Sequence, residues 1–218
     1  SGASLGIVGE VGSGKSTLTR LLLRLYDPPT GTIYLDGVDI VELNLNQLRG
    51  QVAWVEQESF LFSQSIAENL AMGKPEASAK EVEEIAKLAH LHSEIVGFPE
   101  TYQQLLGERG VTLSGGQKQR LCLARALLKE APVLVLDDTL SAVDAETEHG
   151  ILESLRQRRN QQTVVVISHR VSSVRDLDEI IVLEQGKIVQ RGSHDQLLAQ
   201  PGLYRKLYDL QLRPEGQP

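Results

Sequence analysis

The sequence predicts an α/β fold, a mostly parallel β-sheet with helices on both faces, a small antiparallel β part and an inserted α-helical segment. Three observations predict it. A glycine-rich loop separates an apolar run from a helix-like stretch near the N-terminus, apolar runs alternate with helical patterns after residue 115, and Asp36-Gly37 separates two short β-type runs. Alternating strands and helices are typical of a parallel sheet that is buried on both faces.

The first elements follow from short-range patterns. Leu5, Ile7 and Val8 form an apolar strand before the glycine loop, and a helix is predicted over residues 15–25. The runs at 32–35 and 38–40 flank Asp36-Gly37, which is a tight-turn signal, so they predict a hairpin. Another short strand is predicted over residues 52–55.

A helical insertion is predicted next, because residues 65–96 place Val82, Ile85, Ala86 and Ala89 on one helix face. The chain then predicts a helix over 115–129, a strand over 133–136, a helix over 145–158 and a strand over 163–167. Two more strands are predicted at 178–183 and 187–190, followed by an amphipathic segment with Leu203, Leu207 and Leu210. The tail 213–218 is predicted to be disordered.

Charge and hydropathy restrict the class of protein. The chain has 29 acidic residues against 22 Lys and Arg, a formal charge of −7, whereas a nucleic-acid binder carries a basic stripe. No window approaches the roughly 18 apolar residues of a membrane-spanning helix, and no signal segment is present. We therefore expect a cytoplasmic chain that does not bind nucleic acid. Because it enters an apolar run almost at once, we also expect it to be cut at the front.

Residues 9–16, Gly-Glu-Val-Gly-Ser-Gly-Lys-Ser, fit the phosphate-binding pattern G-x-x-x-x-G-K-[ST] between a strand and a helix. The glycines let backbone amides surround phosphates, Lys15 supplies a cation to the terminal ones, and Ser16 offers a hydroxyl to Mg²⁺. The helix start adds the positive end of its dipole. We predict a nucleotide-phosphate site formed by Gly12, Ser13, Gly14, Lys15, Ser16 and Thr17.

Two further segments carry polar groups at element ends. Asp137 follows the apolar run 133–136, at the edge where parallel sheets bind ligands, and is a predicted partner of Mg²⁺. Ser114, Gly115 and Gly116 open the helix over 115–129. One reading makes Ser114 an N-cap and the glycines a loop without function. Such a helix start is also an anion site with free amides, and the residues alone leave both readings open.

These motifs resemble one family. Residues 9–16 (Walker A), 133–137 (Walker B) and 113–117 (Leu-Ser-Gly-Gly-Gln) resemble the nucleotide-binding domain of ATP-binding cassette proteins over essentially the whole chain. The resemblance implies a P-loop NTPase (RecA-like) core at 1–64 and 126–218, without its N-terminal β segment. It also implies an α-helical subdomain at 65–125 that ends in the Leu-Ser-Gly-Gly-Gln helix. ATP and Mg²⁺ are the implied ligands, and ATP hydrolysis is the implied reaction.

The resemblance extends to other positions. Gln57 matches the glutamine that contacts Mg²⁺ and the attacking water and senses the membrane domain, and His169 matches the histidine that contacts the γ-phosphate. Residues 141–144 resemble the D-loop at the dimer interface. Residues 107–110, Gly-Glu-Arg-Gly, resemble the exporter loop that touches intracellular coupling helices.

The family also implies the partners. Two such domains pair head to tail, so that the ATP on one domain's Walker motifs is covered by the other's Ser114, Gly115, Gly116 and Gln117. The implied partners are a second nucleotide-binding domain and transmembrane domains, at the cytoplasmic face of the cell membrane.

The sequence departs from the family at Asp138, where a glutamate normally acts as general base. Aspartate is one methylene shorter, and a base must lie within about 2.6–3.2 Å of the proton that it takes. We therefore expect slow hydrolysis at this chain's own site, as in one half of a heterodimeric bacterial multidrug exporter whose partner is a sister subunit. The family's adenine-stacking aromatic precedes the glycine loop, and this chain starts too late to include it.

An exporter-type transport ATPase is favoured, because 107–110 and 60–69 resemble exporters. The alternatives are a soluble cassette ATPase in translation or repair, an importer ATPase subunit, and a non-hydrolysing regulator. The span from Gln57 to Ser114 is too short for the coiled coil of one class of repair proteins. The transported substrate, the transport direction beyond the resemblance, and the choice between homodimer and heterodimer stay open.

Overall fold

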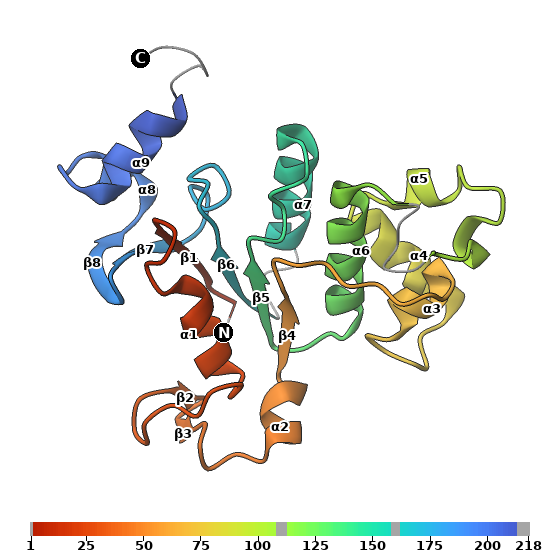
Figure 1. Ribbon diagram of the computed structural model, residues 1–218, viewed down its shortest axis with the longest axis horizontal. Helices are drawn as coiled ribbons and strands as arrows, with labels where there is room; N and C mark the ends of the chain where they lie inside the picture. The colour runs from red at the N-terminus through yellow and green to blue at the C-terminus, as the bar shows by residue number, and fades with distance from the viewer. Residues whose placement is uncertain (1, 108–112, 158–161, 213–218) are drawn as a thin grey trace.

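The main sheet has six strands in the order β4-β5-β6-β1-β7-β8 (Figure 1). The computed structural model describes residues 2–107, 113–157 and 162–212. All neighbouring strands are parallel except β7 and β8, which confirms the predicted mostly parallel α/β fold. The strands are β1 (Ser4–Gly9), β4 (Val52–Val55), β5 (Val133–Asp137), β6 (Thr163–Ile167), β7 (Glu179–Glu184) and β8 (Lys187–Gly192).

The small antiparallel part is a separate hairpin of β2 (Tyr34–Leu35) and β3 (Val38–Asp39). Its two turn residues have positive φ, 50° at Asp36 and 82° at Gly37. Two consecutive residues with positive φ match the twist of a two-residue hairpin, and glycine adopts that conformation without steric cost. The Asp-Gly signal thus predicted this turn correctly.

Helices fill the connections, and they differ from the prediction at several points. The first helix ends at Leu22 rather than at residue 25, and the stretch 65–96 is divided among three helices, two of them capped by Ser65 and Ser78. Neither α2 nor α8 was predicted. The helices are α1 (Lys15–Leu22), α2 (Leu45–Gly50), α3 (Ile66–Ala71), α4 (Ala79–Leu88), α5 (His92–Ile95), α6 (Gly115–Leu128), α7 (Ala145–Gln157), α8 (His194–Leu198) and α9 (Leu203–Leu212), with a 3₁₀ turn at Thr101–Gln103. Residue 158 and the tail 213–218 lie outside the described residues.

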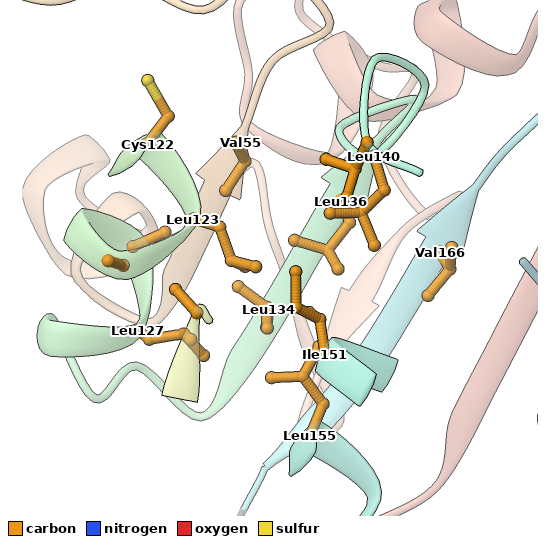
Figure 2. Close-up of a cluster of buried hydrophobic side chains, with 14 of the residues drawn as sticks. Val55, Cys122, Leu123, Leu127, Leu134, Leu136, Leu140, Ile151, Leu155 and Val166 are labelled. Carbon is orange, nitrogen blue, oxygen red and sulfur yellow. The ribbon is translucent and has the colours of Figure 1, made fainter. Parts of the chain in front are cut away.

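Both faces of the sheet are buried, because successive side chains of a strand point to opposite faces. In β5, Val135 packs with Leu22 and Leu23 at the end of α1. Leu134 and Leu136 face the other way, toward side chains of α6 and α7 (Figure 2). The unbroken apolar run of β5 is therefore explained by burial on two sides.

The helices α3, α4 and α5 lie beyond α6, away from the sheet (Figure 1). Helix α6 contacts both this helical group and β4, and it runs without a break to Leu128. Because β1, β5 and β6 are parallel, their C-terminal ends meet at one edge of the sheet. The glycine loop, Asp137 and the segment after β6 are brought together there.

Candidate functional site

The glycine loop between β1 and α1 has a shape that requires glycine. Gly12 and Gly14 have φ of 83° and 102°, values that residues with a Cβ rarely adopt. A Cβ on Gly9 would lie 2.3 Å from the Leu183 carbonyl oxygen. The loop is also tied to the β7–β8 turn, since the Gly186 N–H donates to the Ser13 carbonyl oxygen at 2.9 Å. The loop is thus a fixed cradle of backbone at the start of α1.

Lys15 lies at the mouth of this loop. Its Nζ donates to the carbonyl oxygens of Gly9 at 2.7 Å and Glu10 at 2.9 Å. Burial lowers the pKa of the ammonium group, while the nearby carboxylates of Asp138 and Asp137 act in the opposite direction. The loop therefore holds a partly desolvated cation beside two carboxylates, and a phosphate could replace its carbonyl partners.

Asp137 ends β5 with only 5% of its surface exposed. Burial raises the pKa of this carboxyl group, and the neighbouring Asp138 raises it further, whereas a hydrogen bond with Ser16 and the charge of Lys15 lower it. Gln57, after β4, lines the same cleft as Ser16 and Asp137. A hydroxyl, a carboxylate and an amide oxygen are ligands of the kind that Mg²⁺ takes, together with water and phosphate oxygens, so these three residues fit that ion.

Asp138 and His169 form a direct pair. The Nδ1 atom of His169 lies 2.9 Å from one Asp138 carboxylate oxygen and 3.0 Å from the other. Asp138 has a φ of 49°, and its N–H donates to the Ile167 carbonyl oxygen at 2.8 Å. The backbone after β5 is thus fixed to the end of β6, and it holds the carboxylate under an imidazole ring that is 52% exposed.

These groups line one cleft of about 420 Å³. It brings together nine of the residues predicted from the sequence, and Ser13 is buried directly behind it, 3.4 Å from the Lys15 Nζ atom. The nine are Gly12, Gly14, Lys15, Ser16, Thr17, Gln57, Asp137, Asp138 and His169.

The remaining predicted group, residues 114–117, does not line this cleft. We call it the signature segment. Ser114 caps α6, because its Oγ accepts from the Gln117 N–H at 3.2 Å, and the Gln117 side chain accepts from the Ser114 N–H at 2.8 Å. Gln117 also donates to Glu94 at 2.6 Å. Ser114 is therefore the N-cap, as one reading predicted, but Gly115 and Gly116 belong to α6 rather than to a loop. Ser114 and Gly115 remain exposed at the helix start.

Sequence reasoning missed two polar residues, one in α6 and one beside His169, that both contact residues 141–142. Buried Gln119 donates to the Ser141 hydroxyl at 3.0 Å and accepts from the Ala142 N–H at 2.9 Å. Arg170, next to His169, donates to the Ser141 carbonyl oxygen at 2.7 Å. The sequence shows only that Gln119 is a polar residue inside an otherwise buried helix, and this pattern does not reveal which residue it bonds. Of the predicted exporter loop at 107–110, only Gly107 falls within the described residues.

None of the helices in the described parts of the chain is long and apolar enough to cross a membrane.

Comparisons with known proteins agree with this geometry. The family model described as ABC transporter matches residues 1–141. The chain is 46% identical to the uncharacterized ABC transporter ATP-binding protein YknU of Bacillus subtilis, over 98% of this chain and 36% of YknU. It is 48% identical to the multidrug resistance-like ATP-binding protein MdlA of Escherichia coli, over 96% of this chain and 36% of MdlA. It thus spans about a third of the length of these curated relatives.

The fold agrees as well. A bacterial Atm1-family ABC exporter solved with ATP bound superposes with a TM-score of 0.94 at 41% identity, covering 99% of this chain and 38% of that one. One conclusion follows from the sheet order, the glycine loop after β1 and the matched family model. The chain has the P-loop NTPase fold and belongs to the ABC transporter family.

Proposed function

We propose that this chain binds ATP with Mg²⁺ in the cleft and hydrolyses it to drive export across a membrane, through ATP-dependent head-to-tail dimerisation. One observation carries the proposal. The glycine loop, Lys15, Asp137, Gln57 and His169 line a single cleft, whereas the signature segment lies outside it with its first residues exposed. The cleft supplies groups that would hold a triphosphate on one side, and we infer that the exposed helix start covers the ATP of a second chain.

Each group has a role that follows from its chemistry. The amides of residues 12–17 and the start of α1 hold the phosphates. Lys15, released from the Gly9 and Glu10 carbonyl oxygens, neutralises the terminal phosphates. Ser16, Asp137 and Gln57 would hold Mg²⁺, which supplies neutralisation of the charge that develops during phosphoryl transfer. His169 would contact the γ-phosphate, and Asp138 and Gln57 would orient the attacking water.

Asp138 is the reason to expect slow hydrolysis at this chain's own site. Its carboxylate is one methylene shorter than the glutamate of the family, and both oxygens already lie within 3.0 Å of the His169 ring. A general base acts only from hydrogen-bonding distance of the proton that it takes. We propose that this site mainly holds ATP, while the signature segment completes the active site of a sister subunit.

The division of the chain follows the same proposal. We place the nucleotide-binding core at 1–64 and 126–218 and the helical subdomain at 65–125, with α6 crossing the boundary as one continuous helix. The Gln119 contact to Ser141 and Ala142 keeps α6 tied to the D-loop.

A second cleft is suited to a membrane domain. It measures about 310 Å³ and is lined by residues that include Trp54, Phe60, Met72 and Arg125. Phe60 and Met72 are 56% and 40% exposed, and the Trp54 indole N–H lacks a hydrogen-bond partner among the described residues. A helical segment of the transporter's membrane domain would cover the exposed Phe60 and Met72 side chains, placing the chain at the cytoplasmic face of the cell membrane.

The names of the relatives support export over the alternatives. MdlA is named a multidrug resistance-like protein, and the superposed structure is an exporter. No observation favours a soluble ATPase of translation or repair, an importer subunit or a non-hydrolysing regulator.

Substitution of Asp138 tests the proposal. We expect Asp138→Glu to raise single-turnover ATP hydrolysis at this site by about tenfold or more, because a positioned general base contributes roughly 10²–10⁴-fold. Asp138→Asn, which keeps the size but removes the base, is the matched control and should remain slow. The rates are measured for the chain alone and with its partner subunit. Equal rates for the native chain and Asp138→Glu would rule out the slow-site proposal.

A further inference from the structure

A residue near the C-terminus contacts the backbone on both sides of Arg170. Gln211 lies in α9, forty-two positions from His169 in the sequence. Its side-chain amide donates from Nε2 to the His169 carbonyl oxygen at 2.6 Å, and its Oε1 accepts from the Val171 N–H at 2.8 Å. One amide therefore satisfies an acceptor and a donor of the same loop, a two-point contact that fixes orientation as well as position.

The segment that receives this contact is also anchored elsewhere, because the Ser168 N–H donates to the Ile7 carbonyl oxygen at 3.1 Å and the Arg170 side chain donates to the Ser141 carbonyl oxygen at 2.7 Å. We call residues 168–171 the switch segment. It follows the end of β6 and is neither helix nor strand. Inside it, the Arg170 N–H donates to the Ser168 Oγ at 3.0 Å, and the Val171 side chain is buried. The two hydrogen bonds of Gln211 connect the switch segment to α9.

Helix α9 is itself well placed to act as a support. Tyr204, in its first turn, is fully buried. Its hydroxyl lies 2.7 Å from the His194 Nδ1 atom, and α9 contacts β1 and β8 of the sheet. Gln211 therefore projects from a helix fixed to the same sheet that carries the glycine loop.

We propose that Gln211 is a positioning residue for the switch histidine. By holding the backbone on both sides of Arg170, it sets the direction in which the His169 ring leaves the chain, toward Asp138 and the phosphate end of the cleft. This rests on the proposed role of His169 in ATP hydrolysis. It makes α9 part of the apparatus that aligns the site, although no side chain of α9 lines the cleft.

The first test is kinetic. We expect Gln211→Leu to lower the saturated single-turnover rate of ATP hydrolysis by about tenfold, since small misplacements of a positioned group cost rate steeply. The ATP concentration for half-saturation should change less than about twofold. Lys206→Leu, an exposed residue of the same helix, is the matched control and should leave both unchanged.

A double-variant cycle separates positioning from a general loss of structure. If Gln211 acts through His169, then Gln211→Leu should cause no further loss in a His169→Ala background. An equal loss in both backgrounds, or no loss in the native chain, would overturn the proposal.

Amide exchange gives a readout that does not depend on activity. In Gln211→Leu the Val171 amide should exchange on the order of tenfold faster, because its acceptor is gone. In Gln211→Glu it should stay protected, since a carboxylate still accepts, while the rate falls because the donor to His169 is lost. Unchanged exchange of the Val171 amide in Gln211→Leu would show that Gln211 does not hold the switch segment, and the proposal would be overturned. A different outcome is that His169→Ala keeps the full rate of hydrolysis while Val171 exchange still becomes faster in Gln211→Leu. The contact made by Gln211 would then be supported, and the proposed role of His169 would be wrong.

Discussion

Asp137 shows at the scale of one residue how function and stability oppose each other. Its carboxyl group is buried, and both burial and Asp138 raise its pKa. A raised carboxyl pKa means that the folded protein holds the proton more tightly than the unfolded chain does. At neutral pH the charged Asp137 therefore reduces the free energy of unfolding. Under the proposed function, this charge would be needed to hold Mg²⁺.

We therefore predict that Asp137→Asn raises the free energy of unfolding at pH 7, without nucleotide or metal, by about 0.5–2 kcal/mol. Asparagine keeps the acceptor for Ser16 and removes the charge. Mg²⁺-dependent ATP hydrolysis should fall by roughly 10² or more. Denaturant unfolding in the presence of a chelator measures the first effect.

The pH dependence of this gain has a definite sign. As the pH falls through the raised pKa of Asp137, the native carboxyl group takes up a proton and its cost disappears. The difference between Asp137→Asn and the native chain should thus be largest near neutrality and shrink toward acid. A variant that is less stable at pH 7, or a gain that does not change with pH, would contradict this account.

The glycine pattern and the end of the apolar run 133–136 predicted the loop residues and Asp137 of the cleft locally, whereas Gln57, Asp138 and His169 were predicted only through the family resemblance. The sequence did not predict that Asp138 and His169 touch, because that contact needs the ends of β5 and β6 side by side. Gln119 and Gln211 were missed for the same reason. Each acts on backbone far away in the sequence, so no spacing or motif marks it.

At the scale of elements, local signals predicted strands better than short helices. The apolar run of β5 and the Asp36-Gly37 turn were correctly interpreted, because burial on both faces and a two-residue turn leave distinct patterns. Helix α2 was missed, since only the Asn44 side chain, accepting from the Asn46 N–H at 2.8 Å, marks its start. Helix α8 was also missed, although Ser193 and Gln196 form a capping box. The strand order depends on tertiary packing and was not predicted.

Helix α6 carries a prediction of its own at its first turn. A Cβ on Gly116 would lie 2.8 Å from the Ala142 carbonyl oxygen, whereas one on Gly115 would meet only the Ala142 Cβ at 3.4 Å. Gly116→Ala should therefore push α6 away from the D-loop and lower the free energy of unfolding by about 1–3 kcal/mol. Gly115→Ala should be neutral or stabilise by up to about 1 kcal/mol, because alanine favours a helix over glycine. Urea unfolding of both variants provides the comparison, and equal shifts in one direction would show that the Ala142 contact does not control this turn.

At the scale of the whole molecule, the two parts of the proposed ATP site, the phosphate-binding cleft and the signature segment, lie at different places on one chain. The cleft holds the phosphate-binding groups, and the exposed start of α6 lies outside it, so one chain cannot cover its own ATP with its signature segment. Each chain also carries a net charge of −7, which opposes self-association. In the proposed dimer, ATP would therefore supply the contacts that hold two chains together.

We predict that the chain is mainly monomeric without nucleotide and that ATP with Mg²⁺ shifts it toward a dimer. A ligand drives such a change only if it has more favourable contacts in the closed state than in the open one, and ATP gains the second chain's signature segment only on closure. Light scattering with and without ATP measures the shift, and slow hydrolysis at Asp138 should let the dimer persist long enough to be observed. Lys15→Ala is the control, because it removes the cation for the terminal phosphates and should remain monomeric with ATP present. A stable dimer in nucleotide-free solution would show that protein contacts alone suffice, and the link between ATP binding and closure would then fail.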